Sequence, residues 1–235
     1  MKDIELYCDG SSRGNGQENC RAAAAALLRY GEHMRAVAAY IGPLTNQQAE
    51  IVAACVGLEA LRERCRVTVH SDSKYLVETM RGAFGRKTNH EFWARADAAA
   101  SRHEVTWEWV ESSSKKVKKH PTNPYQEACD RLARAVSATG EVNEQLLEET
   151  VKRLRGENTP AVVRAVMDAL RYLAGSCDGA RARDHAGFSM YDAELGHRLA
   201  GKESLRPGEL SLARTLLRKY TGQIEGYNPT IVALI

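Results

Sequence analysis

The segment Ile4–Ser11, IELYCDGS, decides the fold because it alternates apolar and polar residues and then changes to turn-forming residues. Such alternation predicts a half-buried β-strand, so we expect a strand over 4–8 with Asp9 at its end. The compact stretch Val67–His70 is rich in β-branched residues and runs into Ser71 and Asp72. It predicts a second strand that is also followed by an aspartate.

Two segments separated by a glycine turn follow the first strand. Arg21–Tyr30 is rich in alanine, which by intrinsic propensity favours a helix. Its length, the turn at Gly31 and the similar segment His33–Ile41 instead fit a β-hairpin. We therefore expect both segments to be strands.

Helical periodicity and capping residues indicate the remaining elements of the first half. Thr45 and Asn46 suit the start of a long amphipathic helix, and Pro124 suits the first turn of another. The predicted elements are a helix over Gln47–Arg64, a short helix through Met80, a helix over Asn89–Arg102, a strand over Val105–Val110 and a helix over Pro124–Val136. Three strands, a helix, and then alternating strand and helix describe a mixed α/β domain.

Beyond Gly140 only helical patterns follow. We expect helices over Asn143–Arg155, Pro160–Ala174, Met190–Ala200 and Pro207–Tyr220. The sequence therefore predicts an α/β domain over 1–138 and an all-helical C-terminal domain or extension over 139–235. The role of that extension is not evident from its residues.

Composition limits the class of protein. The net charge is only +3, and six cysteines occur singly, without the paired spacing of a zinc site or a disulfide framework. We expect Cys8, Cys55 and Cys129 to be buried thiols in a reducing compartment. No stretch has the layout of a membrane span or a secretory signal, so we expect a cytoplasmic protein with no membrane partner.

Four acidic residues carry the candidate chemistry: Asp9, Glu50, Asp72 and Asp130. A single carboxylate near an element end is usually a helix cap or a solvated charge. Here the flanks matter, because residues 1–138 resemble the type 1 ribonuclease H family in several separated motifs. These are Tyr7–Ser11 with Gly14 and Asn15, Thr45–Glu50, Val69–Ser73 with Tyr75, Trp107–Val110, and His120 ten residues before Asp130.

The resemblance implies an RNase H-like five-stranded mixed sheet flanked by helices, and an endonuclease that hydrolyses the RNA strand of RNA–DNA hybrids. Its products would carry a 5′-phosphate and a 3′-hydroxyl. It implies two Mg²⁺ ions, with Mn²⁺ as a substitute, held about 4 Å apart by carboxylates. Asp9 would bridge the two ions, Asp130 would help to hold one, Glu50 and Asp72 would complete the other, and His120 would move a proton or help product release.

The resemblance also implies contacts with an RNA–DNA hybrid, told from DNA through the RNA 2′-hydroxyl groups. The substrate-binding candidates are Gly10, Ser12, Asn15, Asn46, Gln47, Lys74, Lys115, Lys116, Lys118 and Lys119. The chain departs from the family in three places. The usual basic, tryptophan-rich protrusion is reduced to Arg81–Lys87, a lysine-rich loop precedes His120, and Gln126 stands where the family often has Asn.

Other functions remain open at this level. The alternative is a hybrid-binding adaptor whose C-terminal helices recruit a replication or repair partner, and those helices could contact protein or nucleic acid. A proofreading-type exonuclease would have Glu where Ser11 stands, and an integrase would end its motif with Glu. Cleavage of a hybrid separates the enzyme from the adaptor. We expect a monomer.

Overall fold

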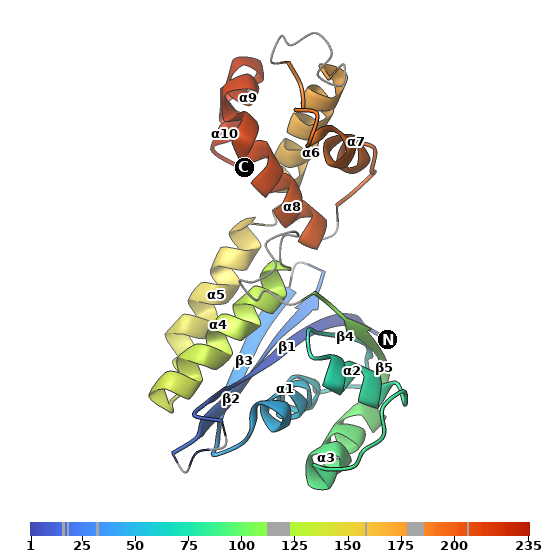
Figure 1. Ribbon diagram of the computed structural model, residues 1–235, viewed down its shortest axis with the longest axis vertical. Coiled ribbons are helices and arrows are strands. Elements are labelled where there is room, and N and C mark those ends of the chain that lie inside the picture. Colours follow the sequence, from blue (N-terminus) through green and yellow to red (C-terminus); the bar gives the residue numbers. More distant parts are fainter. Residues whose placement is uncertain are drawn as a thin grey trace. The chain divides into compact units, whose positions relative to one another are not determined.

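The computed structural model describes all residues of the chain except 16, 18, 32, 112–122, 158, 178–185 and 206. These described residues form two compact units. The first consists of the residues before 112 together with Tyr125–Arg155, and the second consists of Gly156–Ile235 together with Asn123 and Pro124. Figure 1 labels the elements of both units.

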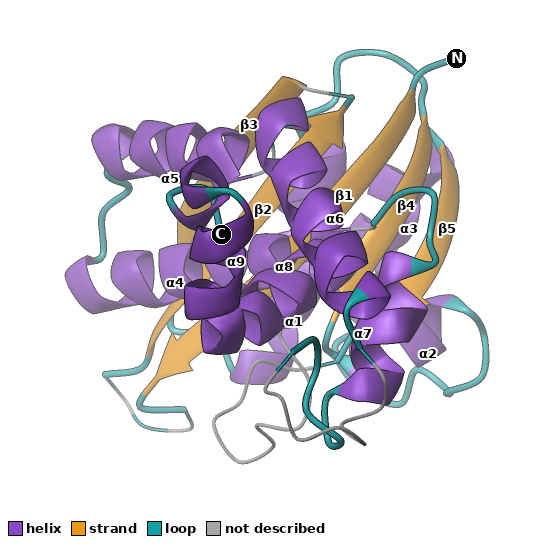
Figure 2. Cartoon of the chain, turned by 90° about the horizontal axis from the view of Figure 1, so that it is seen from above, coloured by secondary structure: helices purple, strands orange, loops and turns teal. Residues whose placement is uncertain are grey.

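The first unit is built on one five-stranded sheet in the order β3-β2-β1-β4-β5 (orange in Figure 2). The strands are β1 (Asp3–Arg13), β2 (Arg21–Tyr30), β3 (His33–Gly42), β4 (Arg66–Ser71) and β5 (Glu104–Trp109). β1 pairs antiparallel with β2, and β2 with β3, whereas β4 pairs parallel with both β1 and β5. The predicted mixed sheet is confirmed.

The alanine-rich segment is a strand, as the hairpin pattern predicts. Ala22–Ala26 are fully buried in β2, between β1 and β3. A central strand satisfies its backbone hydrogen bonds on both sides, and this outweighs the helical propensity of alanine. Gly31 supplies the left-handed conformation at the turn, with φ of 56°.

The prediction that the first strand ends at Asp9 is wrong. β1 continues to Arg13 because it pairs with β2 as far as Arg13 and Arg21. Hairpin pairing therefore overrides the turn propensity of Asp9, Gly10 and Ser11. Asp9 lies inside the strand and not in a turn.

Helices cover the two faces of this sheet (Figure 1). The helices are α1 (Asn46–Glu59), α2 (Lys74–Met80), α3 (His90–Ser101), α4 (Pro124–Thr139) and α5 (Glu144–Glu157). α1 ends at Glu59 and not at Arg64 as predicted, since the chain needs the intervening residues to reach the start of β4. Leu6 and Cys8 pack with α1 and α3, whereas Tyr7 packs with α4.

Helix α5 packs on the first unit. Leu154 is fully buried in the same apolar cluster as Tyr7 and Leu132, and Leu147 and Val151 lie against that cluster. The compact unit therefore includes α5 and reaches Arg155. The division of function after residue 138 stays a prediction.

The second unit is a small helical bundle with its own apolar core. Its helices are α6 (Pro160–Gly175), α7 (Ala193–Ala200), α8 (Pro207–Leu217), the 3₁₀-helix η1 (Arg218–Tyr220), α9 (Thr221–Tyr227) and α10 (Pro229–Val232). α7 begins later than the predicted Met190, because Ser189 and Asp192 first form a turn in which the Ser189 carbonyl accepts from both Asp192 and Ala193. The short helices α9 and α10 were not predicted from the sequence. Among the described residues, no helix combines the length and apolarity required to cross a bilayer.

Candidate active site

The register of two parallel strands brings Asp9 and Asp72 together. The last pair between β1 and β4 is Tyr7 with His70, and each aspartate lies two residues beyond its member of that pair. Side chains repeat every two residues along extended backbone, so both carboxylates emerge on the same side of the sheet. Asp9 is buried, whereas Asp72 is half-buried just past the end of β4.

The carboxylate of Glu50, on α1, approaches the same two aspartates. Thr45 and Gln48 form a reciprocal capping box that starts α1, and Glu50 follows in its second turn. At Gly10 a Cβ atom would collide with the backbone of Ala49 and Glu50, so only glycine lets α1 pass so close to β1. The Gly10 N–H donates to Glu50 Oε2 over 3.2 Å, which fixes the carboxylate.

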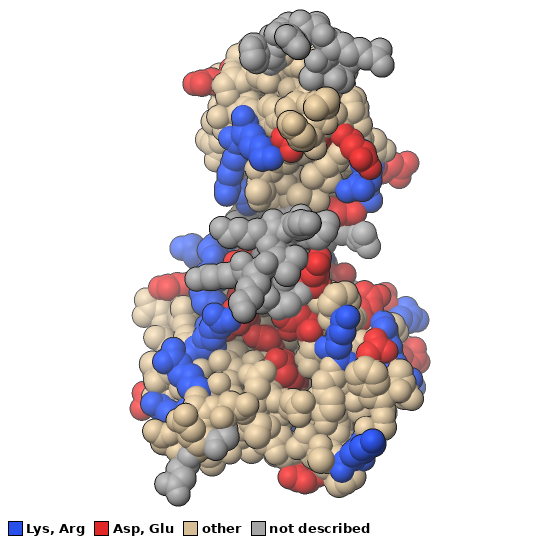
Figure 3. Space-filling view, in the orientation of Figure 1, with Lys and Arg blue, Asp and Glu red and all other residues tan. Residues whose placement is uncertain are grey.

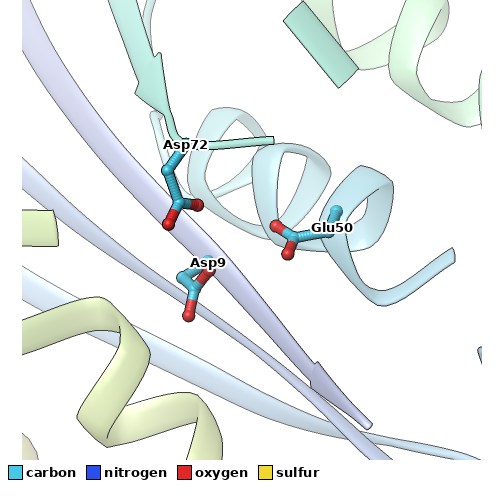
Figure 4. Close-up of side chains that lie close together, drawn as sticks. All are labelled: Asp9, Glu50 and Asp72. Carbon is cyan, nitrogen blue, oxygen red and sulfur yellow. The ribbon is translucent and has the colours of Figure 1, made fainter. Parts of the chain in front are cut away.

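Asp9, Glu50 and Asp72 form a cluster in which one carboxylate oxygen from each lies within 4.8 Å of the others. Figure 4 shows the three side chains pointing toward one another from β1, α1 and the end of β4. The carboxyl of Asp130, on α4, forms an ion pair of 2.7 Å with Arg134, and its charge acts on both Asp9 and Glu50. The structure therefore gathers three of the four predicted acids in one cluster and places Asp130 near them.

Burial and mutual repulsion perturb this cluster. Burial raises the pKa of Asp9 to about 10, and the charges of Glu50, Asp72 and Asp130 add to the rise. Burial, followed by the charge of Asp72, raises the pKa of Glu50 to about 8, against the opposing hydrogen bond from Gly10. With these raised pKa values Asp9 and Glu50 hold their protons near neutral pH, and a cation bound between them would favour their ionised forms, so the site fits a bound cation.

The donor set favours a hard divalent cation. The four acids offer only oxygen atoms, which Mg²⁺ and Mn²⁺ prefer to nitrogen or sulfur. The neighbouring thiols of Cys8 and Cys129 point instead to the carbonyl oxygens of His70 and Tyr7. Burial raises the pKa of both thiols well above the usual value, so they stay protonated and are poor ligands.

The substrate-binding candidates fall into several groups. Asn46 and Gln47 are exposed at the start of α1, and the Asn46 N–H donates to Asn15 Oδ1 over 3.1 Å, which joins the β1–β2 turn to this helix. The Ser12 hydroxyl is engaged internally, since it donates to the Leu44 carbonyl over 2.8 Å. Gly10 has a structural role, because it allows α1 to pack close to β1.

Lys74 is exposed at the start of α2, with its Nζ 4.6 Å from the centre of the Trp109 ring. The Trp109 indole donates to the Asp72 carbonyl over 3.1 Å, so this cation and ring lie beside the acidic cluster. Figure 3 shows acidic side chains gathered on one face of the first unit, with basic side chains to either side. His120, Lys115, Lys116, Lys118 and Lys119 lie outside the described residues.

Two arginines of the short basic segment Arg81–Lys87, after α2, make contacts within the fold. Arg81 donates to the Trp107 carbonyl over 2.6 and 2.9 Å, and Arg86 pairs with Asp97 while lying over the Trp93 ring. The Arg81 guanidinium thus holds the end of α2 against β5, and the Arg86 guanidinium holds the following segment against α3. They do not form the basic protrusion of the resembling family.

Sequence reasoning missed the role of Gln126. Its amide nitrogen donates to the Cys8 carbonyl over 3.0 Å and to Asp72 Oδ1 over 3.3 Å. Its place one helical turn before Asp130, on the same face of α4, was the available signal. A buried amide at that spacing reaches the same strand ends as the predicted carboxylate.

Known proteins resemble the first unit. Residues 1–138 match the family model described as RNase H. The ribonuclease H of Cronobacter sakazakii is 39% identical over 149 residues, which cover 58% of this chain and 88% of the relative. That of Clostridium botulinum is 32% identical over 140 residues, covering 57% and 94%. The solved RNase H1 of the archaeon Halobacterium salinarum has a TM-score of 0.47 and 24% identity, and covers 59% of this chain and 99% of its own.

Proposed function

Because the chain belongs to the RNase H family, whose model matches residues 1–138, we propose that it is an endonuclease that hydrolyses the RNA strand of RNA–DNA hybrids. The observation that carries the proposal is the cluster of Asp9, Glu50 and Asp72, with the charge of Asp130 acting on Asp9 and Glu50. We place this activity in residues 1–138 and assign the helices after them a separate, unidentified role.

The carboxylates would hold the cofactor. Asp9 would contribute to both members of a pair of Mg²⁺ ions, since it lies in the cluster with Glu50 and Asp72 and the charge of Asp130 acts on it as well. Bound ions of this kind supply an activated water and neutralise the charge that develops on the leaving oxygen. Mn²⁺ has the same preference for oxygen ligands and would substitute. The products would be a 5′-phosphate and a 3′-hydroxyl.

The residues of the chain itself set the geometry of the reaction. Gly10 fixes Glu50 through its N–H, and the β1–β4 register fixes Asp9 against Asp72. Preorganised groups of this kind lower the barrier because little reorganisation remains when the scissile phosphate arrives. His120 would take or give a proton beside the site, for which an imidazole is suited near neutral pH.

Recognition of the hybrid would use the exposed polar residues around the cluster. Asn15, Asn46 and Gln47 lie together at the start of α1, where short polar side chains can contact RNA 2′-hydroxyl groups. Lys74 beside Trp109 and the loop lysines Lys115, Lys116, Lys118 and Lys119 would contact phosphates. Binding should tolerate sequence changes and weaken as salt concentration rises.

The adaptor alternative is not favoured. A binding module that had lost catalysis would not need four acids brought together at an electrostatic cost. Recruitment of a replication or repair protein through the C-terminal helices is compatible with the enzyme, but no contact of the second unit with a partner supports it.

Cleavage tests the proposal directly. Labelled RNA–DNA hybrid, duplex RNA and duplex DNA are incubated with the wild type and with Asp9→Asn, with Mg²⁺ and with excess chelator. We expect cleavage of the RNA strand of the hybrid only, by the wild type only, and only with Mg²⁺. Intact hybrid after incubation with the Mg²⁺-loaded wild type would refute the function.

A further inference from the structure

Gln126 connects three of the elements that carry the acids. It lies in the first turn of α4 with 1% of its surface exposed. Its amide nitrogen donates to the carbonyl of Cys8, which directly precedes Asp9, and to the carboxylate of Asp72. Asp130 follows one turn later on the same helix, so α4 contacts Asp72 through an amide and also carries the fourth acid.

The two acceptors determine how the amide is oriented. A rotated amide would place its own oxygen against the Cys8 carbonyl and the Asp72 carboxylate, which is repulsive. In the observed orientation Gln126 Oε1 is buried and has no hydrogen-bond partner among the described residues. Leaving a buried acceptor without a donor costs about 1–3 kcal/mol. Within the described residues, the side chain therefore keeps its contact with Asp72 although its own oxygen has no donor.

Packing alone does not explain this residue. Tyr125, Ala128 and Leu132 already bury one face of α4 against the sheet. An apolar side chain of similar length would fill the same volume without an unpartnered oxygen. What only an amide supplies here is an N–H group that can donate to both strand ends.

We propose that Gln126 is a positioning residue, whose amide orients the Asp72 carboxylate relative to Asp9 so that the pair can hold a divalent cation. The proposal rests on the proposed function, because it assigns a partner to one of the presumed metal ligands. Hydrogen bonds to a ligating carboxylate restrict its rotation, and loss of such a partner typically weakens metal affinity or activity about 10–100-fold. The role is specific to the longer side chain, since Asn at this position is one methylene shorter.

Gln126→Met is the test, because methionine keeps the length and volume of glutamine but has no N–H group. Mg²⁺ and Mn²⁺ are titrated into the full chain without hybrid, and binding is followed by calorimetry. We expect the dissociation constant for the metal to rise about 10-fold, with a melting temperature within about 4 °C of the wild type. The Mg²⁺ concentration for half-maximal cleavage should rise by the same factor, while KM for the hybrid stays unchanged.

Gln145→Met is the matched control, since Gln145 is exposed on α5 and its side chain donates to its helical neighbour Glu149. It should leave metal affinity unchanged. Gln126→Asn should give an intermediate loss of metal affinity, because its amide is one methylene group further from Asp72. A Gln126→Met protein with the metal affinity of the wild type would overturn the proposal.

A measurement on the unaltered protein covers the case in which Gln126→Met does not fold. The side-chain NH₂ resonances of Gln126 should shift when Mg²⁺ is added, and those of Gln145 should not. Unshifted Gln126 resonances at saturating Mg²⁺ would contradict the assignment. These readouts do not require cleavage, so a wild type that binds Mg²⁺ through this site but leaves hybrids intact would refute the nuclease and not the role of Gln126.

Discussion

Each of the two units contains an acidic side chain whose pKa its surroundings shift, and the two shifts have opposite directions. In the first unit Asp9 faces other carboxylates, and burial followed by their charges raises its pKa to about 10. In the second unit burial alone would raise the pKa of Asp192, but hydrogen bonds from Tyr220 and Lys219 outweigh it and lower the pKa. Tyr220 donates over 2.7 Å, Lys219 over 2.9 Å and Ser189 over 3.2 Å.

The difference separates structural charge from functional charge. Asp192 has enough donors to hold its ionised form, so its carboxylate links α7 to η1 and completes the fold of its unit. Among the described residues, the Gly10 N–H on Glu50 is the only such donor to Asp9 or Glu50. Buried acids with so few donors indicate a site for a positive ligand, which is why the acids of the first unit, and not Asp192, predict catalysis.

Asp9→Asn should have the largest effect and the clearest contrast. Loss of the carboxylate shared within the cluster should reduce hybrid cleavage by at least about 10³-fold, as expected for several kcal/mol of lost transition-state stabilisation. The metal-free protein should become more stable to urea by about 1–3 kcal/mol, because repulsion is removed. A variant that loses activity and stability together would contradict the view that this cluster is strained.

Two glycines allow a second comparison. Gly10→Ala should destabilise the first unit by about 1–3 kcal/mol, since the new methyl group collides with the backbone of α1. Gly222→Ala, in α9, meets no atom within 4 Å and should stabilise its helix by about 0.5–1 kcal/mol. Thermal unfolding followed by circular dichroism measures both, and cleavage should fall only in Gly10→Ala. Equal stabilities would show that α1 can move away from β1 without cost.

Asp192→Asn should lower stability and leave cleavage unchanged, which is the opposite of the result expected for Asp9→Asn. The amide loses the charge that Lys219 and Tyr220 compensate, so the second unit should lose about 1–2 kcal/mol of stability. The rate at saturating hybrid should not change. Urea denaturation with circular dichroism and a single-turnover cleavage assay give the two readouts. A stabilised Asp192→Asn protein would remove the distinction between the two groups.

The pH dependence of the metal-free protein should be the smallest effect. Between the ordinary aspartate pKa of 3.8 and about 10, folded Asp9 binds more protons than unfolded Asp9, so its contribution to the free energy of unfolding falls as pH rises. Asp192 has a lowered pKa, so its contribution is lost only as pH falls below the ordinary value of 3.8.

Urea denaturation at about pH 5.5 and about pH 8.5, with and without Mg²⁺, checks the sign. Mg²⁺ should stabilise the protein more at the higher pH, because its ligands must be deprotonated. Asp9→Asn serves as the control and should show a smaller difference between the two pH values. A stabilisation by Mg²⁺ that is the same at both would count against binding at this cluster.

Much of the fold and the identity of the acids could be predicted from sequence, because strand alternation, caps and motif spacing are local signals. The same signals misplaced the end of β1, since turn propensity at Asp9–Ser11 does not report the partner strand that pairs with it. They could not reveal that the Ser12 hydroxyl is engaged by Leu44, because that contact joins residues far apart in the chain. For the contact of Gln126 with Asp72, the helical spacing of Gln126 to Asp130 was the one local signal. The short helices α9 and α10 are fixed mainly by Ile224 and Ile231 packing in the second core.

The shared position of Asp9 and Asp72, two steps beyond the Tyr7–His70 pair, also limits how the gene can vary. A single inserted or deleted codon between Tyr7 and Asp9, or between His70 and Asp72, would turn one carboxylate to the far side of the sheet, and in the first case it would also move Gly10 away from α1. Such a protein would lose the cluster of acids. Length changes should therefore accumulate in the turns and the C-terminal helices, and be absent from these two short stretches.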